Sequence, residues 1–381
     1  MKSKAFKNPG ILIAATLILI LLSSGCRMAY ICHVAAGQFR LINDSIPVED
    51  ALKKDSLRYE QKERLRLVAG IKEFGERELG LKRTENYETV YLESNRRPVY
   101  VVSASPKDRL ASVTWWFPVV GDMPYLGFFD LEKAKAKKEE LIKKDLDVIL
   151  GMAEAYSTLG WFKDPVTLNL VEGSTVDLAE TILHEMTHTT LYINGQGEFN
   201  EGLAVLVGKV GAYLFFNQTF GPSHPFTLEA KKSIEDERIF CSFLNPLLKR
   251  LERLYNSQTG YQEKLVQREK VFAASMKDFR GLKSKFKTNR FTRFGSKGMN
   301  NAYLMSVGLY HRNFHLFESV LKKKGNSIRD TLAFFKGLSE EGDDILESAR
   351  KWLNAGNCSR DGRASKPFPT ATIRVADCLT N

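Results

Sequence analysis

The feature that most constrains this chain is the run His184-Glu185-Met186-Thr187-His188. Two histidines four residues apart become neighbours on one face only where the backbone is helical, because four residues cover about one turn. The chain has six histidines in 381 residues, so chance alone gives roughly 0.006 such matches per chain. The run therefore predicts a helix with a chemically active face.

The residues around this run support the helix. Ser174 or Thr175 can cap its start, and Asp177 falls in the first turn, where an acidic side chain is favourable. Gly195 is a natural stop. The expected buried side of the helix carries Leu178, Ile182 and Met186.

Two histidines at this spacing can bind one zinc ion, and Glu185 between them can act on a water molecule at the metal. A catalytic zinc site needs a third protein ligand. The helix beyond His188 covers roughly 9 Å, and the five-residue turn 195–199 can span roughly 16 Å. That reach returns Glu201, at the start of a second antiparallel helix, to the histidines. Glu198 is the alternative ligand, but it lies nearer the turn and reaches less well.

These motifs resemble those of the gluzincin metallopeptidases, in which an HExxH helix precedes a helix bearing a glutamate ligand. The chain resembles still more closely the bacterial lipoprotein aminopeptidases, through the run Asn200-Glu201-Gly202-Leu203-Ala204 and the segment Tyr156–Phe162. The resemblance implies an α+β, zincin-like peptidase with a small mixed sheet, an HExxH helix and a largely helical C-terminal half.

The resemblance also implies one Zn²⁺ per chain, held by His184, His188 and Glu201, with Glu185 as general base. Two departures matter. Only 12 residues separate His188 from Glu201, fewer than in many gluzincins, and Val205 stands where many have an aspartate that supports a ligand. That support must come from elsewhere in the chain.

Tyr310 is the catalytic candidate for stabilising the oxyanion, by resemblance to the tyrosine or histidine that gluzincins place there; His311 is a second candidate. The alternative for Tyr310 is a core position. Apolar residues recur at helical spacing from Tyr303 through Tyr310 to Leu321, which is typical of a buried helical stripe.

The predicted function is a membrane-anchored, zinc-dependent aminopeptidase that hydrolyses peptides, with Glu185 activating water. The alternatives are a zinc endopeptidase and a non-catalytic metal-binding lipoprotein. An aminopeptidase must hold the free ammonium of its substrate. Glu154, in a segment that faintly resembles an exopeptidase motif, is a weak candidate, and a solvated carboxylate is the alternative.

The N-terminus has the pattern of an export signal. Lys2, Lys4 and Lys7 precede an apolar run over 11–22, which is too short for the roughly 20 residues of a membrane span. The ending Ser23-Ser24-Gly25-Cys26 resembles the bacterial lipobox. We therefore expect residues 1–25 to be a lipoprotein signal peptide and Cys26 to carry a lipid anchor. A plain signal peptide and an uncleaved anchor are the alternatives.

This anchor predicts a location in the bacterial cell envelope, facing the periplasm or the exterior. Export to an oxidising compartment would allow disulfides among the remaining cysteines. Three connectivities are possible among Cys32, Cys241, Cys358 and Cys378, and Cys358 with Cys378 is the favoured pair. Four free thiols are the alternative.

Composition is that of a folded protein, with 43% apolar and 27% charged residues. We predict a zinc peptidase domain over 26–351 and a polar tail over 352–381. The domain comprises a helical part (28–81), a sheet-containing part (91–170) and a helical active-site part (174–351). Strands are expected at 99–102, 113–117, 126–129 and 148–150, with a helix at 131–144.

The stretch 249–297 is strongly basic, with 14 Lys or Arg, four Asp or Glu, and interleaved phenylalanines. A solvated helical face is the default interpretation. Contact with anionic lipid head groups is the alternative. Nucleic-acid binding is not expected, because the N-terminus predicts export.

Overall fold

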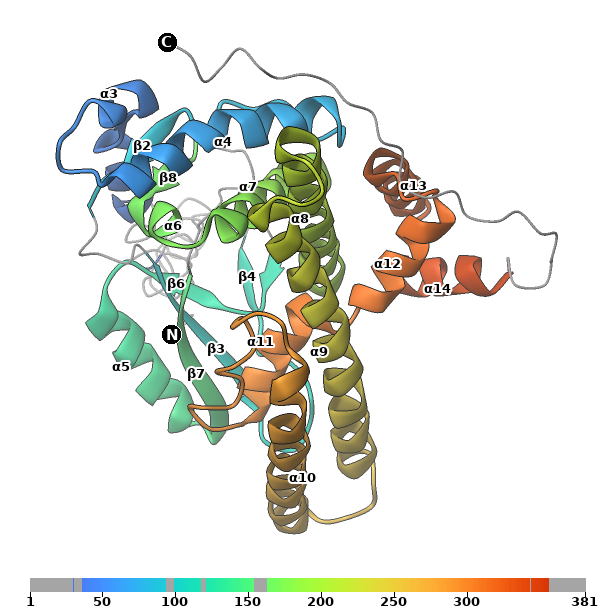
Figure 1. Ribbon diagram of the computed structural model, residues 1–381. Helices are drawn as coiled ribbons and strands as arrows, with labels where there is room; N and C mark the ends of the chain where they lie inside the picture. The colour runs from blue at the N-terminus through green and yellow to red at the C-terminus, as the bar shows by residue number, and fades with distance from the viewer. Residues whose placement is uncertain are drawn as a thin grey trace, which may run out of the picture.

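The computed structural model describes residue 30 and residues 36–93, 99–117, 121–153, 163–342 and 344–355. Within these ranges the chain is an α+β protein in which small sheets precede a largely helical C-terminal half (Figure 1). The predicted α+β class with a largely helical C-terminal half is thus confirmed. The signal segment 1–25, Cys26, the segment 154–162 and the tail beyond 355 lie outside the described residues.

The N-terminal part is less continuously helical than the sequence predicts. Helices α3 (Val48–Leu52) and α4 (Tyr59–Arg77) are preceded by the short strand β1 (Ile46–Pro47). Pro47 explains the interruption, because a proline disfavours helical backbone in the residue before it. Helix α4 packs its apolar side inward, and its buried residues include Leu65, Val68 and Ile71.

The remaining strands form three small sheets with the orders β1-β2-β8, β6-β3-β7 and β4-β5. They are β2 (Thr89–Tyr91), β3 (Val99–Pro106), β4 (Trp115–Phe117), β5 (Gly121–Met123), β6 (Leu126–Phe128), β7 (Leu146–Ala153) and β8 (Val166–Thr167). Strands β3 and β7 pair antiparallel over their full length, with Val102 opposite Leu150. Strands β2 and β8 run parallel. The four predicted strands are therefore present, and β3 and β7 extend beyond the predicted ranges.

Helix α5 (Leu131–Ile142) is the helix predicted at 131–144, and it packs on the sheet built on β3. The Asp130 side chain caps it by accepting a hydrogen bond from the backbone N–H of Lys133 at 2.8 Å. Ala134 and Leu141 are buried against Val102 and its neighbours in a small separate core.

The C-terminal half consists of helices. They are α6 (Leu168–Glu172), α7 (Thr175–Thr190), α8 (Gly197–Phe220), α9 (Pro225–Tyr255), α10 (Tyr261–Leu282), the 3-10 turn η1 (Lys283–Lys285), α11 (Asn301–His311), α12 (Phe314–Lys323), α13 (Ile328–Glu340) and α14 (Ile345–Ala355). Among the described residues, α8 alone has the length and apolar character of a membrane span, but 83% of its apolar window is buried inside the protein. Helix α8 is thus the central core helix.

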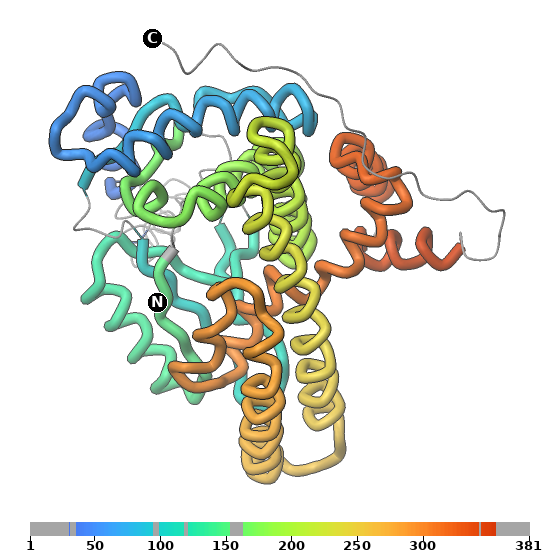
Figure 2. The backbone as a smooth tube through the Cα atoms, viewed as in Figure 1, coloured from blue at the N-terminus to red at the C-terminus, as the bar shows by residue number. Residues whose placement is uncertain are grey.

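Helices α7 and α8 lie side by side at the centre, with α4 on one side and α9 on another (Figure 2). Their apolar residues form the largest core, which includes Ile182, Phe199 and Phe216. A second core lies between α9, α10 and the chain before α11, and includes Phe240, Phe279 and Phe294.

The apolar stripe predicted from Tyr303 to Leu321 belongs to two helices. Helix α11 ends at His311, and α12 begins at Phe314. Phe314 and Phe317 are fully buried, whereas Tyr310 is half-buried. The predicted stripe is therefore broken between Tyr310 and Phe314, and Tyr310 does not continue the buried face of α12.

Candidate metal centre

Helix α7, which carries the two histidines, begins at the predicted cap. The Ser174 hydroxyl accepts a hydrogen bond from the backbone N–H of Asp177 at 3.0 Å. The helix ends at Thr190, before the predicted stop at Gly195. The Thr190 hydroxyl donates to the carbonyl of Met186 at 2.7 Å, a local bond that competes with continued helix. Gly195 instead occupies the following turn, with φ 76°.

The turn between α7 and α8 is closed by Asn200. Its amide group donates to the carbonyl of Ile193 and its side-chain oxygen accepts from the N–H of Ile193, both at 2.8 Å. This two-bond clamp reverses the chain over a few residues. As a result, Glu201 lies in the second turn of α8, beside the histidines, where the spacing predicts it.

Helices α7 and α8 approach closely at Gly208. A Cβ added there would lie 2.6 Å from the carbonyl oxygen of Glu180 and 3.3 Å from the Cβ of His184. Only glycine allows this approach without displacing backbone. The contact fixes the helix carrying the histidines against the helix carrying Glu201.

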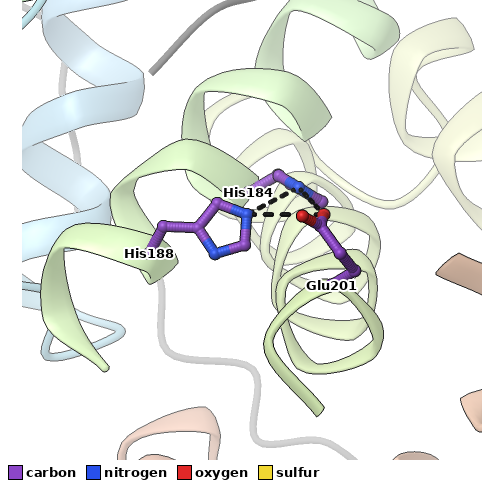
Figure 3. A group of neighbouring side chains, drawn as sticks. All are labelled: His184, His188 and Glu201. Carbon is purple, nitrogen blue, oxygen red and sulfur yellow. Dashed lines mark hydrogen bonds and ion pairs between the residues drawn. The ribbon is translucent and has the colours of Figure 1, made fainter. Parts of the chain in front are cut away.

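The side chains of His184, His188 and Glu201 converge from the two helices (Figure 3). The Nε2 atoms of the two histidines are 3.1 Å apart. The Oε2 atom of Glu201 lies 3.2 Å from Nε2 of His184 and 3.5 Å from Nε2 of His188. The predicted juxtaposition of these three residues is therefore present in the structure.

This triangle has the dimensions of three corners of a zinc tetrahedron. Metal–ligand bonds of about 2.0–2.1 Å at tetrahedral angles place neighbouring donor atoms about 3.3–3.4 Å apart. The measured edges of 3.1 to 3.5 Å bracket this value. Two imidazoles and one carboxylate are also a donor set typical of catalytic zinc. The three residues thus fit a zinc ion in both chemistry and spacing.

Electrostatics couple the three side chains. Burial alone would raise the pKa of the Glu201 carboxyl, but the two histidines hold it well below its usual range. Burial would lower the pKa of His188, yet the Glu201 charge raises it. The Glu185 charge adds to this effect on His188, so its carboxylate lies near the same cluster. Glu185 itself is half-buried.

Tyr310 reaches this cluster from α11. Its ring stacks on that of His184, with centroids 6.2 Å apart and planes at 24°. The nearby Glu201 charge, followed by burial, raises the pKa of Tyr310 well above its usual value. The structure therefore brings Tyr310 to the predicted site.

His311 faces a different neighbour. Its Nδ1 lies 2.6 Å from Oε1 of Glu237, a carboxylate that is fully buried on α9. Its ring packs edge-on against Phe240 and Phe291. Glu237 thus holds the imidazole of His311, the residue that directly follows Tyr310 on α11.

Glu198, the alternative third ligand, is engaged elsewhere. Its carboxylate pairs with Arg312 at 3.1 Å and accepts a hydrogen bond from the Asn313 amide at 3.2 Å. Glu154, the weak candidate for binding the substrate ammonium, lies outside the described residues. Cys241 is a buried free thiol, and the other cysteines, Cys26, Cys32, Cys358 and Cys378, also lie outside them.

Sequence reasoning missed two tyrosines near the centre. Tyr192 packs edge-on against His188, with ring centroids 6.2 Å apart. Its position four residues beyond His188 was a usable signal. Tyr87 is buried with φ 67°, and its pKa is raised well above the usual value by burial and then by the Glu185 charge. No local pattern linked Tyr87 to a helix about 100 residues away.

Sequence reasoning also missed a buried ionic cluster that lies one helical turn from His184. Nζ of Lys209 lies 3.2 Å from Oε2 of Glu180, 2.8 Å from Oγ of Ser233 and 3.5 Å from Oε2 of Glu237. Glu180 stands one turn before His184 on α7, and Glu237 also holds His311. A single lysine within the apolar helix α8 was the available signal.

Comparison with protein families places this geometry in context. Residues 29–350 match a family described as "Putative aminopeptidase". The chain belongs to this family. The matched range contains α7, α8 and α11, which carry the convergent residues. The aminopeptidase family predicted from the motifs is thereby confirmed, and its description indicates a peptide hydrolase. No curated protein and no solved structure matches the chain.

Proposed function

We propose that the chain is a membrane-anchored, zinc-dependent aminopeptidase of zincin-like, gluzincin type. The observation that carries this proposal is the convergence of His184, His188 and Glu201 on one point, with Glu185 beside them. Family membership supports peptide hydrolysis, and the donor set supports zinc as the metal. Together they favour one zinc ion per chain and a peptide substrate.

A bound Zn²⁺ ion supplies Lewis acidity, which polarises the scissile carbonyl group and makes water a usable nucleophile near pH 7. Glu185 performs the proton transfers in this proposal. Its carboxylate accepts a proton from the attacking water and delivers it to the nitrogen of the departing amine. Its place directly after His184 on α7 is what holds the carboxylate beside the reacting groups.

Tyr310 stabilises the developing oxyanion. A tyrosine is protonated at neutral pH, so its hydroxyl can donate a hydrogen bond to negative charge that forms on the former carbonyl oxygen. The ring stacking on His184 sets the position of this donor. His311, oriented by Glu237, is the second candidate for this role.

The aminopeptidase activity rests on family membership, because among the described residues we assign no carboxylate to the substrate ammonium. Membrane anchoring rests on the predicted lipidation of Cys26, which places the enzyme in the bacterial cell envelope with its active site in the periplasm or exterior. Nucleic acid has no part in this function.

The test uses the full-length chain isolated from membranes, in four forms. Zinc content is measured by elemental mass spectrometry, and activity is measured on peptides with free or acetylated N-termini. Glu185→Gln should keep zinc and lose hydrolysis, whereas Glu201→Gln should lose zinc as well. Glu198→Gln is the matched control, since this acid pairs with Arg312, and it should retain both.

The unsubstituted chain should bind one zinc per chain and release residues from free N-termini only. Internal cleavage of acetylated peptides would instead indicate an endopeptidase. Bound zinc without any hydrolysis would favour a metal-binding lipoprotein. Absence of zinc from the unsubstituted chain would overturn the assignment of the metal centre.

A further inference from the structure

The segment 280–297, which we call the basic loop, has an unusual charge pattern. It contains seven Lys or Arg and no Asp or Glu. It includes the end of α10, the turn η1 and the connection to α11. The predicted solvated helix is therefore mostly a loop at this point, and its concentrated charge has no role in the proposed peptide hydrolysis.

The basic loop is held in a fixed shape. Phe291 and Phe294 are buried in the second core, where Phe291 stacks on Phe240 with ring centroids 4.1 Å apart. The fully buried Asp236 accepts hydrogen bonds from the N–H groups of Lys287 and Thr288, both at 2.7 Å. These contacts give the basic loop a fixed conformation against α9.

Most of its cations are left without internal partners. Lys287 pairs with Glu235, and Arg290 pairs with Asp177 and Glu180. The other five have no acidic partner within ion-pair distance in the part of the chain that the structure describes, and all five are exposed: Arg280, Lys283, Lys285, Arg293 and Lys297. Five exposed like charges within 18 residues repel each other until an anionic surface neutralises them.

We propose that the basic loop docks the protein on the anionic phospholipid head groups of the membrane to which Cys26 anchors it. Nucleic acid is the competing anion, but single strands are bound largely by stacking on aromatic side chains. The phenylalanines of the loop pack in or against the second core, so none of them is exposed for stacking on bases. An anionic bilayer needs charge alone.

This inference rests on the proposed membrane anchoring but not on the zinc chemistry. Each Lys or Arg at an anionic surface strengthens membrane partitioning about five-fold. Neutralising three of the five cations should therefore weaken partitioning onto anionic membranes by about 100-fold. The loop would act as a second attachment point that fixes which face of the anchored protein is turned to the bilayer.

The experiment places a photo-crosslinking amino acid at Ser284, an exposed position in η1, in the full-length chain. Ala333 is the matched control, because it is exposed on α13, which lies far from the basic loop (Figure 1). Each protein is bound to phosphatidylcholine vesicles with and without phosphatidylglycerol. Lipid adducts are measured by mass spectrometry, and flotation reports whether the chain is on the vesicles.

We expect lipid adducts at position 284, but not at 333, and at least five-fold more with phosphatidylglycerol. They should disappear in about 1 M salt, where the Debye length is about 3 Å. The variant Lys283→Gln/Lys285→Gln/Arg293→Gln should lose most of them while its circular dichroism stays unchanged. Chains that float without adducts at 284 would overturn the inference alone, and chains that do not float would overturn the anchoring. Preferential crosslinking to added DNA would indicate nucleic-acid binding instead.

Discussion

Replacing Gly208 by alanine tests whether the close packing of α7 on α8 sets the candidate metal centre. The added Cβ would lie 2.6 Å from the carbonyl oxygen of Glu180, whereas ordinary contacts begin at 3.4 Å. The obstacle is backbone in a long helix, which cannot swing aside. The two helices must therefore separate locally by about 0.8 Å.

The expected cost follows from two opposing effects. Overpacking of this kind costs about 1–3 kcal/mol, and a backbone obstacle favours the upper end of that range. Alanine in a helix interior gains about 1 kcal/mol over glycine. We therefore expect Gly208→Ala to lower the free energy of unfolding by about 2 kcal/mol. Because His184 and Glu201 lie on opposite sides of this contact, zinc affinity should fall about ten-fold, as for other losses of ligand support.

Gly337→Ala provides a control of opposite sign. Gly337 lies within α13, and a Cβ there meets no atom within 4 Å. The free energy of unfolding of this variant should rise by about 0.5–1 kcal/mol, and its zinc affinity should be unchanged. Denaturant titration and competition with a zinc chelator measure both quantities. A Gly208→Ala protein as stable as the Gly337→Ala protein, with unchanged zinc affinity, would refute the argument that this contact positions the ligands.

Three further predictions concern the surroundings of the centre. Tyr310→Phe should lower kcat by about 100-fold or more without changing zinc content; unchanged kcat would remove Tyr310 from the mechanism. Lys209→Met should lower the free energy of unfolding by about 3 kcal/mol in denaturant titration, because the buried Glu180 and Glu237 would lose the cation they share and keep only Arg290 and His311; a cost below about 1 kcal/mol would contradict this. Burial raises the pKa of Glu237, but His311 and Lys209 lower it further, so the net shift is downward. The resulting stability is present above the unfolded pKa of about 4.3 and is lost as pH falls through the folded value. The free energy of unfolding, measured from pH 7 downward, should become more similar in Glu237→Gln and the unsubstituted protein. A difference in this free energy that stays constant with pH would exclude the linkage.

The sequence alone predicted that His184, His188 and Glu201 come together, because their spacing is a local property. Two histidines four residues apart, a capping serine and a short turn are all contained within 28 residues, from Ser174 to Glu201. Helix geometry and the reach of the turn then limit where Glu201 can lie. The strands were found for the same reason, because runs such as 99–102 are read one segment at a time.

Other features were decided only by how distant segments pack. The helical part predicted over 28–81 is interrupted by a strand that exists because Ile46 pairs with Val90. The single helical stripe through Tyr310 is broken because Phe314 and Phe317 turn into the main core.

The partners of Glu180, Lys209 and Glu237 come from three different helices, so no spacing within one helix reveals them. The same holds for the exposed cations of the basic loop, since only the buried phenylalanines show which side of the loop faces solvent. Periodicity and capping are encoded in neighbouring residues, whereas a charge that pairs across helices depends on the whole arrangement that burial of the core selects.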